Sequence, residues 1–339
     1  MDTFDNNHTE QTEQTENVNF GTRLDLTALL ESVNNIKKEL GTVIVGQEKI
    51  IDQLLAAILS NGHVLLEGVP GVAKTITAKL LSKTLDLGFS RIQFTPDLMP
   101  SDILGTSVFD LSKSAFEFKK GPVFSNFILI DEINRAPAKT QAALFEVMEE
   151  RQITIDGKTY VLDTPFLVIA TQNPIEQEGT YRLPEAQLDR FLFKINIDYP
   201  NLDEEIAIIQ RENVLQDRNK LESVKQVVIK SDILNYQSLV KQIIIEQNLI
   251  EYIAKIVMNS RENAFLYLGA SPRASIAILN ASKAFAALRG RDFVTPEDIK
   301  EAAIPVLQHR VVVTPEREME GITSTEIIRQ IVDTVEIPR

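Results

Sequence analysis

The stretch EGVPGVAKT, residues 67–75, combines glycines, a lysine and a threonine at a spacing that suits phosphate binding. The strict pattern is Gly, four residues, then Gly-Lys-Ser/Thr. Here Gly68 opens it, Lys74 and Thr75 close it, and Ala73 replaces the last glycine. A strand-like run precedes the loop and a helical run follows, so backbone N–H groups and a helix N-terminus would converge on phosphate. We expect Lys74 to face the β- and γ-phosphates, Thr75 to bind Mg²⁺, and Ala73 to take ordinary right-handed dihedrals.

Polar side chains also follow two other apolar runs. FILIDE ends in Asp131 and Glu132, and VIATQNP ends in Asn173 and Pro174. One carboxylate at a strand end can hold Mg²⁺ through water, and a second can polarise the attacking water. Asn173 would then stand beside the γ-phosphate as a neutral polar group. Solvated acids at a strand end, and an asparagine that caps a turn before Pro174, are the plainer alternatives.

Two arginines could supply positive charge to a transferred phosphoryl group. LPEAQLDRFLF places Arg190 where a helical stretch runs into an apolar run, and GASPRAS places Arg273 in the first turn of a helix. Because the planar fork of arginine matches phosphate oxygens, Arg190 suits a clamp supplied by a neighbouring subunit. Taken alone, Arg190 is better explained as a surface arginine paired with Asp189. The helix dipole mildly disfavours a cation in a first turn, which indicates that Arg273 serves something other than helix stability.

Short apolar runs alternate with helical patterns up to about Pro200 and would position these side chains. Five runs predict strands: HVLLE (63–67), RIQF (91–94), FILID (127–131), FLVIAT (166–171) and FKINI (193–197). Their alternation with polar loops and helices is typical of a parallel sheet covered on both faces. PAKTQAALFEVMEER predicts a helix, and Asp156-Gly157 between two extended runs predicts a hairpin.

The two ends of the chain differ from this α/β core. The N-terminal segment is polar and acidic, and too little of it is apolar for it to order itself. After the core the strand pattern vanishes and amphipathic helices follow, two of which begin at Ser271-Pro272 and Thr295-Pro296. The predicted organisation is a disordered acidic tail over residues 1–25, an α/β core over 26–200 and a helical domain over 201–339.

Composition limits the ligand classes and the compartment. The 339 residues carry a formal net charge of −13, which repels phosphate backbones and disfavours binding to nucleic acid. The chain has no Cys and three scattered His, which excludes thiolate metal sites and disfavours a histidine-built one. No apolar run reaches the roughly 18 residues that cross a bilayer, and the acidic N-terminus does not resemble a secretory signal. We therefore expect a soluble, cytoplasmic protein.

Together the motifs resemble the MoxR family of AAA+ ATPases. The resemblance rests on GVPGVAKT, QFTPDLMPSDILG, GPVFSN, DEINRAPAKTQAALFEVMEERQ, ATQNPIEQEGTYRLPEAQLDRF and GASPRAS, in this order. It runs from about residue 27 to 320, and alanine before the lysine is the family's normal loop residue. The resemblance implies an AAA+ P-loop NTPase with a five-stranded parallel sheet between helices and a C-terminal all-helical lid domain. It also implies a hairpin inserted at about 103–121 and a second hairpin at Asp156-Gly157.

The resemblance also implies roles for single residues. Lys74, Glu132, Asn173 (sensor 1), Arg190 (arginine finger) and Arg273 (sensor 2) would be catalytic, and Thr75 and Asp131 would hold Mg²⁺. ATP would be bound by Val45, Gly46, Gln47, Gly68, Val69, Pro70, Gly71, Val72, Ala73, Lys74, Thr75 and Ile76, the first three of them around the adenine. The lid is displaced in this group, which leaves open whether Arg273 acts within its own chain or on a neighbour's nucleotide.

The function that the resemblance implies is ATP hydrolysis in a ring, most simply a hexamer, coupled to remodelling, maturation or activation of client protein complexes. The expected cofactors are ATP and Mg²⁺, and the expected client carries a von Willebrand factor A domain. One alternative is a nucleotide-gated scaffold with little turnover, which the presence of both Glu132 and Asn173 disfavours. Another is a DNA-associated motor, which the acidic balance of the chain disfavours.

Overall fold

The computed structural model describes residues 23–174, 180–215 and 223–338. The tail expected over residues 1–25 lies almost wholly outside this range, and its disorder stays a prediction. The first described helix, α1, begins at Thr27, close to where the resemblance begins.

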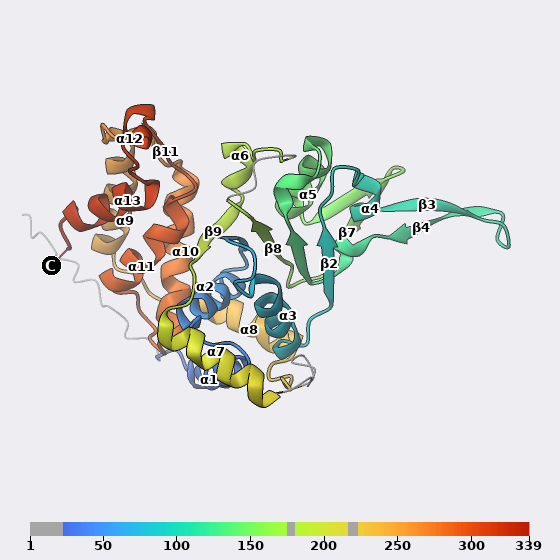
Figure 1. Ribbon diagram of the computed structural model, residues 1–339, viewed down its shortest axis with the longest axis horizontal. Coiled ribbons are helices and arrows are strands. Elements are labelled where there is room, and N and C mark those ends of the chain that lie inside the picture. The colour runs from blue at the N-terminus through green and yellow to red at the C-terminus, as the bar shows by residue number, and fades with distance from the viewer. Residues whose placement is uncertain (1–22, 175–179, 216–222, 339) are drawn as a thin grey trace, which may run out of the picture.

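A five-stranded sheet with all strands parallel forms the centre of the fold, in the order β2-β5-β8-β1-β9 (Figure 1). Its strands are β1 (His63–Gly68), β2 (Phe89–Gln93), β5 (Phe127–Asp131), β8 (Leu167–Gln172) and β9 (Phe191–Ile197). The five expected strands are therefore confirmed, with bounds that shift by up to two residues at either end. β1 lies between β8 and β9. The strands that follow β1 in the chain therefore lie on both sides of it, and the direction in which strands are added to the sheet changes beside β1. Ligands of open α/β sheets bind at such a point, beyond the carboxyl ends of the strands.

Helices cover both faces of this sheet, as the continuous apolar strands require. They are α1 (Thr27–Gly41), α2 (Glu48–Leu59), α3 (Lys74–Thr84), α4 (Pro100–Leu104) and α5 (Ala138–Glu150), with short 3-10 turns at Pro122–Phe124 and Ile133–Arg135. The short helix α6 (Glu185–Leu188) comes directly before β9. Alternate residues of β5 divide between two cores. Phe127 and Leu129 belong to the core that includes α1, α2 and α3, whereas Ile128 and Ile130 belong to the core that includes α5.

Both hairpins expected from the sequence are present. β3 (Gly105–Asp110) pairs antiparallel with β4 (Ala115–Lys120), and this hairpin projects from the end of the molecule away from the C-terminal helices (Figure 1). β6 (Gln152–Ile155) pairs with β7 (Lys158–Val161) around Asp156-Gly157, where both residues have positive φ. The Ser107 hydroxyl donates a hydrogen bond to the Asp156 carboxylate at 2.5 Å, which joins the two hairpins.

The C-terminal part is helical, as expected, with one small sheet that the sequence did not predict. Its helices are α7 (Leu202–Leu215), α8 (Lys230–Lys241), α9 (Gln247–Glu262), α10 (Pro272–Leu288), α11 (Pro296–Leu307), α12 (Pro315–Met319) and α13 (Ser324–Thr334). Strands β10 (Leu266–Leu268) and β11 (Val312–Val313) pair antiparallel. Strands this short show no apolar periodicity that a sequence pattern could reveal. The domain limits at residues 25 and 200 stay predictions.

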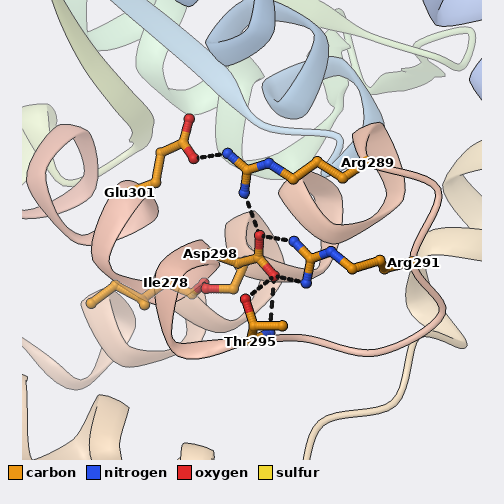
Figure 2. A network of polar contacts seen from close by, with 7 residues as sticks. Ile278, Arg289, Arg291, Thr295, Asp298 and Glu301 are labelled. Carbon is orange, nitrogen blue, oxygen red and sulfur yellow. Dashed lines mark hydrogen bonds and ion pairs between the residues drawn. The ribbon is translucent and has the colours of Figure 1, made fainter. Parts of the chain in front are cut away.

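The start of α11 is fixed by one buried carboxylate (Figure 2). The Asp298 side chain is fully buried and accepts hydrogen bonds from the Thr295 backbone N–H at 2.9 Å and from both terminal nitrogens of Arg291 at 2.6 and 2.8 Å. Arg289 donates to the same carboxylate and also pairs with Glu301. A buried charge is tolerated only where it is paired and hydrogen-bonded in this way. The network therefore joins the end of α10 to the first turn of α11.

An ion pair also joins the C-terminal helices to the sheet. Arg310, almost completely buried, donates its Nε to Asp189 Oδ1 at 2.6 Å and its Nη2 to the Phe191 carbonyl at 2.7 Å. Asp189 additionally accepts a hydrogen bond from Ser271, the residue that precedes α10. The sequence alternative in which Asp189 pairs with Arg190 is therefore wrong. The side chain that neutralises Asp189 comes from more than a hundred residues later in the chain, and no local pattern predicts it.

Candidate functional site

The loop between β1 and α3 is where the sequence placed the phosphate site. β1 ends at Gly68 and α3 begins at Lys74, which confirms the strand–turn–helix context. The expectation for Ala73 is wrong, because its φ of 61° and ψ of 15° lie in the left-handed region. An L-residue there costs about 1–2 kcal/mol, a cost that glycine avoids. The glycine of the strict pattern thus has a conformational reason, and Ala73 introduces strain at the start of α3.

Side chains outside the loop hold its backbone. Gln47, expected beside the adenine, donates its Nε2 to the Val72 carbonyl at 3.1 Å and accepts a hydrogen bond from the Thr77 hydroxyl at 3.1 Å. The Lys74 ammonium donates to the Gly68 carbonyl. Gln47 therefore connects the loop to the first turn of α3 through two hydrogen bonds. The sequence did not predict this contact.

The segment before Gln47 runs beside α7. A side chain at Gly46, whose φ is +74°, would place its Cβ 2.2 Å from Oε1 of Glu204 on α7. The backbone of this segment is therefore in close contact with the first helix after the sheet. The expected contact of Val45, Gly46 and Gln47 with adenine stays a prediction.

Asp131 lies at the end of β5, with both carboxylate oxygens engaged. Its Oδ1 accepts hydrogen bonds from the hydroxyls of Thr75, at 3.2 Å, and of Thr171, at 3.3 Å. Its Oδ2 accepts from the Nε of Arg91 on β2 at 2.6 Å. The hydroxyl and the carboxylate that the sequence assigned to Mg²⁺ are thus brought into direct contact across 56 residues of chain.

Glu132 follows in a left-handed conformation, with a φ of 57°. Its backbone N–H donates to the Thr171 hydroxyl at 3.0 Å. Its Oε2 accepts from Gln93 Nε2 at 2.8 Å and lies 3.0 Å from Arg135 Nε. Gln93 and Arg135 thus hold the Glu132 carboxylate in place directly after β5.

Asn173 lies at the end of a central strand, as expected from the sequence. It directly follows β8 and is buried, with 7% of its surface exposed. β8 pairs with β1 on one side and with β5 on the other. Asn173 therefore emerges between the strand that leads into the phosphate loop and the strand that ends in Asp131.

Arg91 and Gln93 are the site residues that the sequence analysis missed. Both lie on β2, where Gln93 is in register with Asp131 of β5. Residues two apart on a strand share a face, so both side chains can reach the acids at the end of β5. One sequence signal could have indicated them: two polar residues, two positions apart, occur in the RIQF run, which is otherwise typical of a buried strand. Their partners could not be predicted without the strand order.

The two candidate arginines meet on α5. Arg190 donates to the Phe145 carbonyl and lies 3.9 Å from Glu149 Oε2, whereas Arg273 Nη2 donates to Glu149 Oε1 at 3.2 Å. Among the described residues, neither arginine has a hydrogen bond or ion pair with the loop of residues 68–76. Arg190 also lines a surface cavity of about 310 Å³ between α5 and α6. The structure therefore brings Arg190 and Arg273 together at Glu149 of α5.

The residues present fit a divalent cation and a triphosphate. The Thr75 hydroxyl and the Asp131 carboxylate are oxygen ligands of the kind that Mg²⁺ prefers, together with phosphate and water oxygens. No group of three His, Cys, Asp or Glu side chains that could hold a metal alone occurs in the described part of the chain. A cation at Thr75 and Asp131 would therefore depend on oxygens supplied by the nucleotide.

Two family models match this chain. Residues 63–193 match the ATPase family associated with various cellular activities (AAA), and residues 258–331 match an AAA lid domain. Chaperone MoxR1 of Mycobacterium tuberculosis is 44% identical over 310 residues, 89% of this chain and 81% of that protein. The chain belongs to the MoxR family of AAA+ ATPases.

Two further relatives agree over most of the chain. The uncharacterized protein YeaC of Bacillus subtilis is 45% identical over 302 residues, 89% of this chain and 93% of that protein. A crystal structure of a candidate ATPase from Cytophaga hutchinsonii has a TM-score of 0.85 and 46% identity, and the match covers 93% of this chain and 97% of that one. No helix in the described residues is long and apolar enough to cross a membrane. Both the AAA+ core and the helical lid are thus shared with these relatives.

Proposed function

We propose that this MoxR-family chain binds ATP with Mg²⁺ and hydrolyses it in a closed ring, most simply a hexamer, to remodel or activate client protein complexes. The observation that carries the proposal is the contact of the Thr75 hydroxyl with Asp131 at 3.2 Å. It brings the first turn of the helix after the loop to the carboxyl end of β5, where a triphosphate and its cation would meet.

Each residue of the site has a distinct task in this proposal. Lys74 and the loop N–H groups bind the β- and γ-phosphates, and Thr75 and Asp131 hold Mg²⁺, which neutralises phosphate charge when bound. Glu132 polarises the attacking water, and Asn173 orients it beside the γ-phosphate. The hydrogen bond from Gln93 and the ion pair with Arg135 hold the Glu132 carboxylate at the end of β5.

The arginines support a site that is completed by a neighbouring chain. Arg190 and Arg273 contact Glu149 of α5 rather than the phosphate loop of their own chain. A cationic clamp that acts on another chain's phosphate requires a head-to-tail interface, and repeated head-to-tail contacts form a ring where the rotation between chains closes. We therefore place both arginines at the γ-phosphate of the neighbour.

The client in this proposal is a protein rather than a nucleic acid. The β3–β4 hairpin exposes large apolar side chains, with Leu111 86% and Phe116 74% exposed. At its tip, Lys113 is paired with Glu117 at 2.9 Å, so little positive charge remains there for a phosphate backbone. Apolar exposed surface of this kind suits protein contacts. The name chaperone, carried by the mycobacterial relative, agrees with this assignment. Within the proposal, the client carries a von Willebrand factor A domain, as the family resemblance implies.

Replacement of Glu132 by Gln tests the proposal. The Glu132→Gln side chain keeps its shape but cannot polarise water, so ATP should bind and persist while hydrolysis falls by about 10²–10⁴-fold. Fluorescent-nucleotide titration measures binding, and phosphate release measures turnover. The control is Glu320→Gln, which removes an exposed carboxylate of the lid and should change neither. Turnover near the wild-type rate in Glu132→Gln would contradict the assigned role, and loss of binding would show that the side chain is structural.

A further inference from the structure

Arg91 is a cation placed directly on the carboxylate that is expected to hold Mg²⁺. Its Nε donates to Asp131 Oδ2 at 2.6 Å. The Asp131 side chain is only 8% exposed, whereas the Arg91 side chain is 45% exposed. A nearly buried carboxylate requires a counter-charge, and here the neighbouring strand β2 supplies it.

The two oxygens of Asp131 face different partners. Oδ1 accepts hydrogen bonds from Thr75 and Thr171, on the side of the first turn of α3, and Oδ2 faces Arg91. A cation held at Thr75 would therefore be attracted by the carboxylate and repelled by the guanidinium behind it. Because the ion pair is neutral as a whole, Asp131 contributes little net attraction for a divalent cation when no nucleotide is present.

The other acid at the end of β5 is paired in the same way. Glu132 lies 3.0 Å from Arg135 Nε. Without a nucleotide, Asp131 and Glu132 are thus each matched by an arginine. The triphosphate supplies the negative charge that this arrangement lacks.

We propose that Arg91 is an internal counter-ion that excludes free divalent cations from the nucleotide-free site, so that Mg²⁺ enters only together with a triphosphate. This inference rests on the proposed function in one respect, the assignment of Thr75 and Asp131 to the cation. Arg91 acts through Asp131 and is a positioning residue. Arg91 thereby couples the binding of Mg²⁺ to the binding of the nucleotide. Its positive charge repels Mg²⁺ from the empty site, and the negative charge of the triphosphate overcomes this repulsion.

The test measures metal binding to the full-length, nucleotide-free protein. Mn²⁺ is the probe, and its unbound fraction is measured by electron paramagnetic resonance. Arg91→Gln removes the charge while a side-chain amide remains, and should tighten Mn²⁺ binding by about tenfold or more. Arg91→Lys keeps the charge and should bind as weakly as the wild type. The matched control is Arg317→Gln, which changes the net charge equally but removes an exposed pair between Arg317, on α12, and Glu320.

Two further measurements separate the possible outcomes. Adding Asp131→Asn to Arg91→Gln should abolish the gain in Mn²⁺ affinity, which shows that Asp131 is the ligand. Mg²⁺ alone should raise the melting temperature of Arg91→Gln and leave that of the wild type unchanged. Unchanged Mn²⁺ affinity in a folded Arg91→Gln, or an equal gain in Arg317→Gln, overturns the inference. Nucleotide titration of the wild type tests the proposed function separately, because failure to bind ATP would refute that function while leaving the metal result intact.

Discussion

Ala73 is strained by its single methyl group, in a loop that otherwise follows the common phosphate-binding pattern. Its left-handed backbone is a conformation that glycine adopts readily and alanine does not. The hydrogen bond from Gln47 to the adjacent Val72 carbonyl helps to keep the backbone in this arrangement. The strain is therefore tolerated because the surroundings of the loop hold it in place.

The strain at Ala73 predicts a stabilising substitution. Ala73→Gly restores the strict phosphate-loop pattern and should raise the free energy of unfolding by about 1 kcal/mol, since the left-handed cost disappears and glycine's extra flexibility in the unfolded chain offsets part of the gain. Urea unfolding measures the change. Ala78→Gly, in the interior of α3, is the control and should be destabilising. A destabilised Ala73→Gly would show that the loop does not strain alanine.

The strand β1 carries a buried histidine that links two layers of the core. His63 Nδ1 accepts a hydrogen bond from the Val168 backbone N–H at 3.0 Å, and its Nε2 donates to the Met148 carbonyl at 3.2 Å. Only the neutral ring satisfies both partners. Burial, reinforced by the positive charge of Arg151, lowers the pKa of His63 to about 3. Burial also lowers the pKa of His309, close to the end of α11.

These depressed pKa values make stability depend on pH. Below about pH 6.5 the unfolded chain takes up a proton on His63 that the folded chain does not, so stability falls as the pH drops from there toward 3. Between pH 7 and 5 the loss should be about 2 kcal/mol for this one group. His63→Gln can make both hydrogen bonds without titrating, and its unfolding free energy should depend less on pH by that amount. Equal pH dependence in urea unfolding would contradict this account.

In the described part of the molecule, the two candidate arginines meet at Glu149 and make no hydrogen bond or ion pair with the phosphate loop. Arg190 and Arg273 converge on Glu149 from the sheet and from the lid, respectively. The ion pair between Arg310 and Asp189 joins the lid to the sheet beside them. In the proposed ring, arginines that act on a neighbour's nucleotide would make every site depend on two chains, and mixing of variants can detect that dependence.

Complementation between two inactive variants tests this dependence. Arg190→Ala should bind ATP almost normally and hydrolyse it poorly, because the charge that develops on the γ-phosphoryl group loses its clamp. Mixed with Glu132→Gln, it should recover partial activity, since some interfaces then combine an intact Glu132 with an intact Arg190. Steady-state hydrolysis is measured against mixing ratio, with subunit exchange verified. No recovery despite exchange would contradict action between chains, as would full activity of dilute monomers.

The candidate site residues and the elements that carry them could be predicted from the sequence because both depend on local patterns. Lys74, Asp131 and Asn173 each stand next to an apolar run whose length and composition predict a strand or a helix. Parallel strands align their carboxyl ends, so a set of polar residues directly after such runs predicts a common site. The Asp156-Gly157 hairpin and the starts of α10 and α11 follow in the same way from turn and capping residues, whereas the β3–β4 hairpin was expected only from the family resemblance.

The tertiary structure alone decided which side chains meet. The contact of Arg91 with Asp131 depends on β2 lying next to β5, and the pairing of Asp189 with Arg310 depends on how the lid packs on the sheet. The left-handed backbone of Ala73 depends on how the loop closes between β1 and α3. Contacts between distant segments depend on strand order, register and packing, which arise from the whole chain and leave no periodic signal in any one part of it.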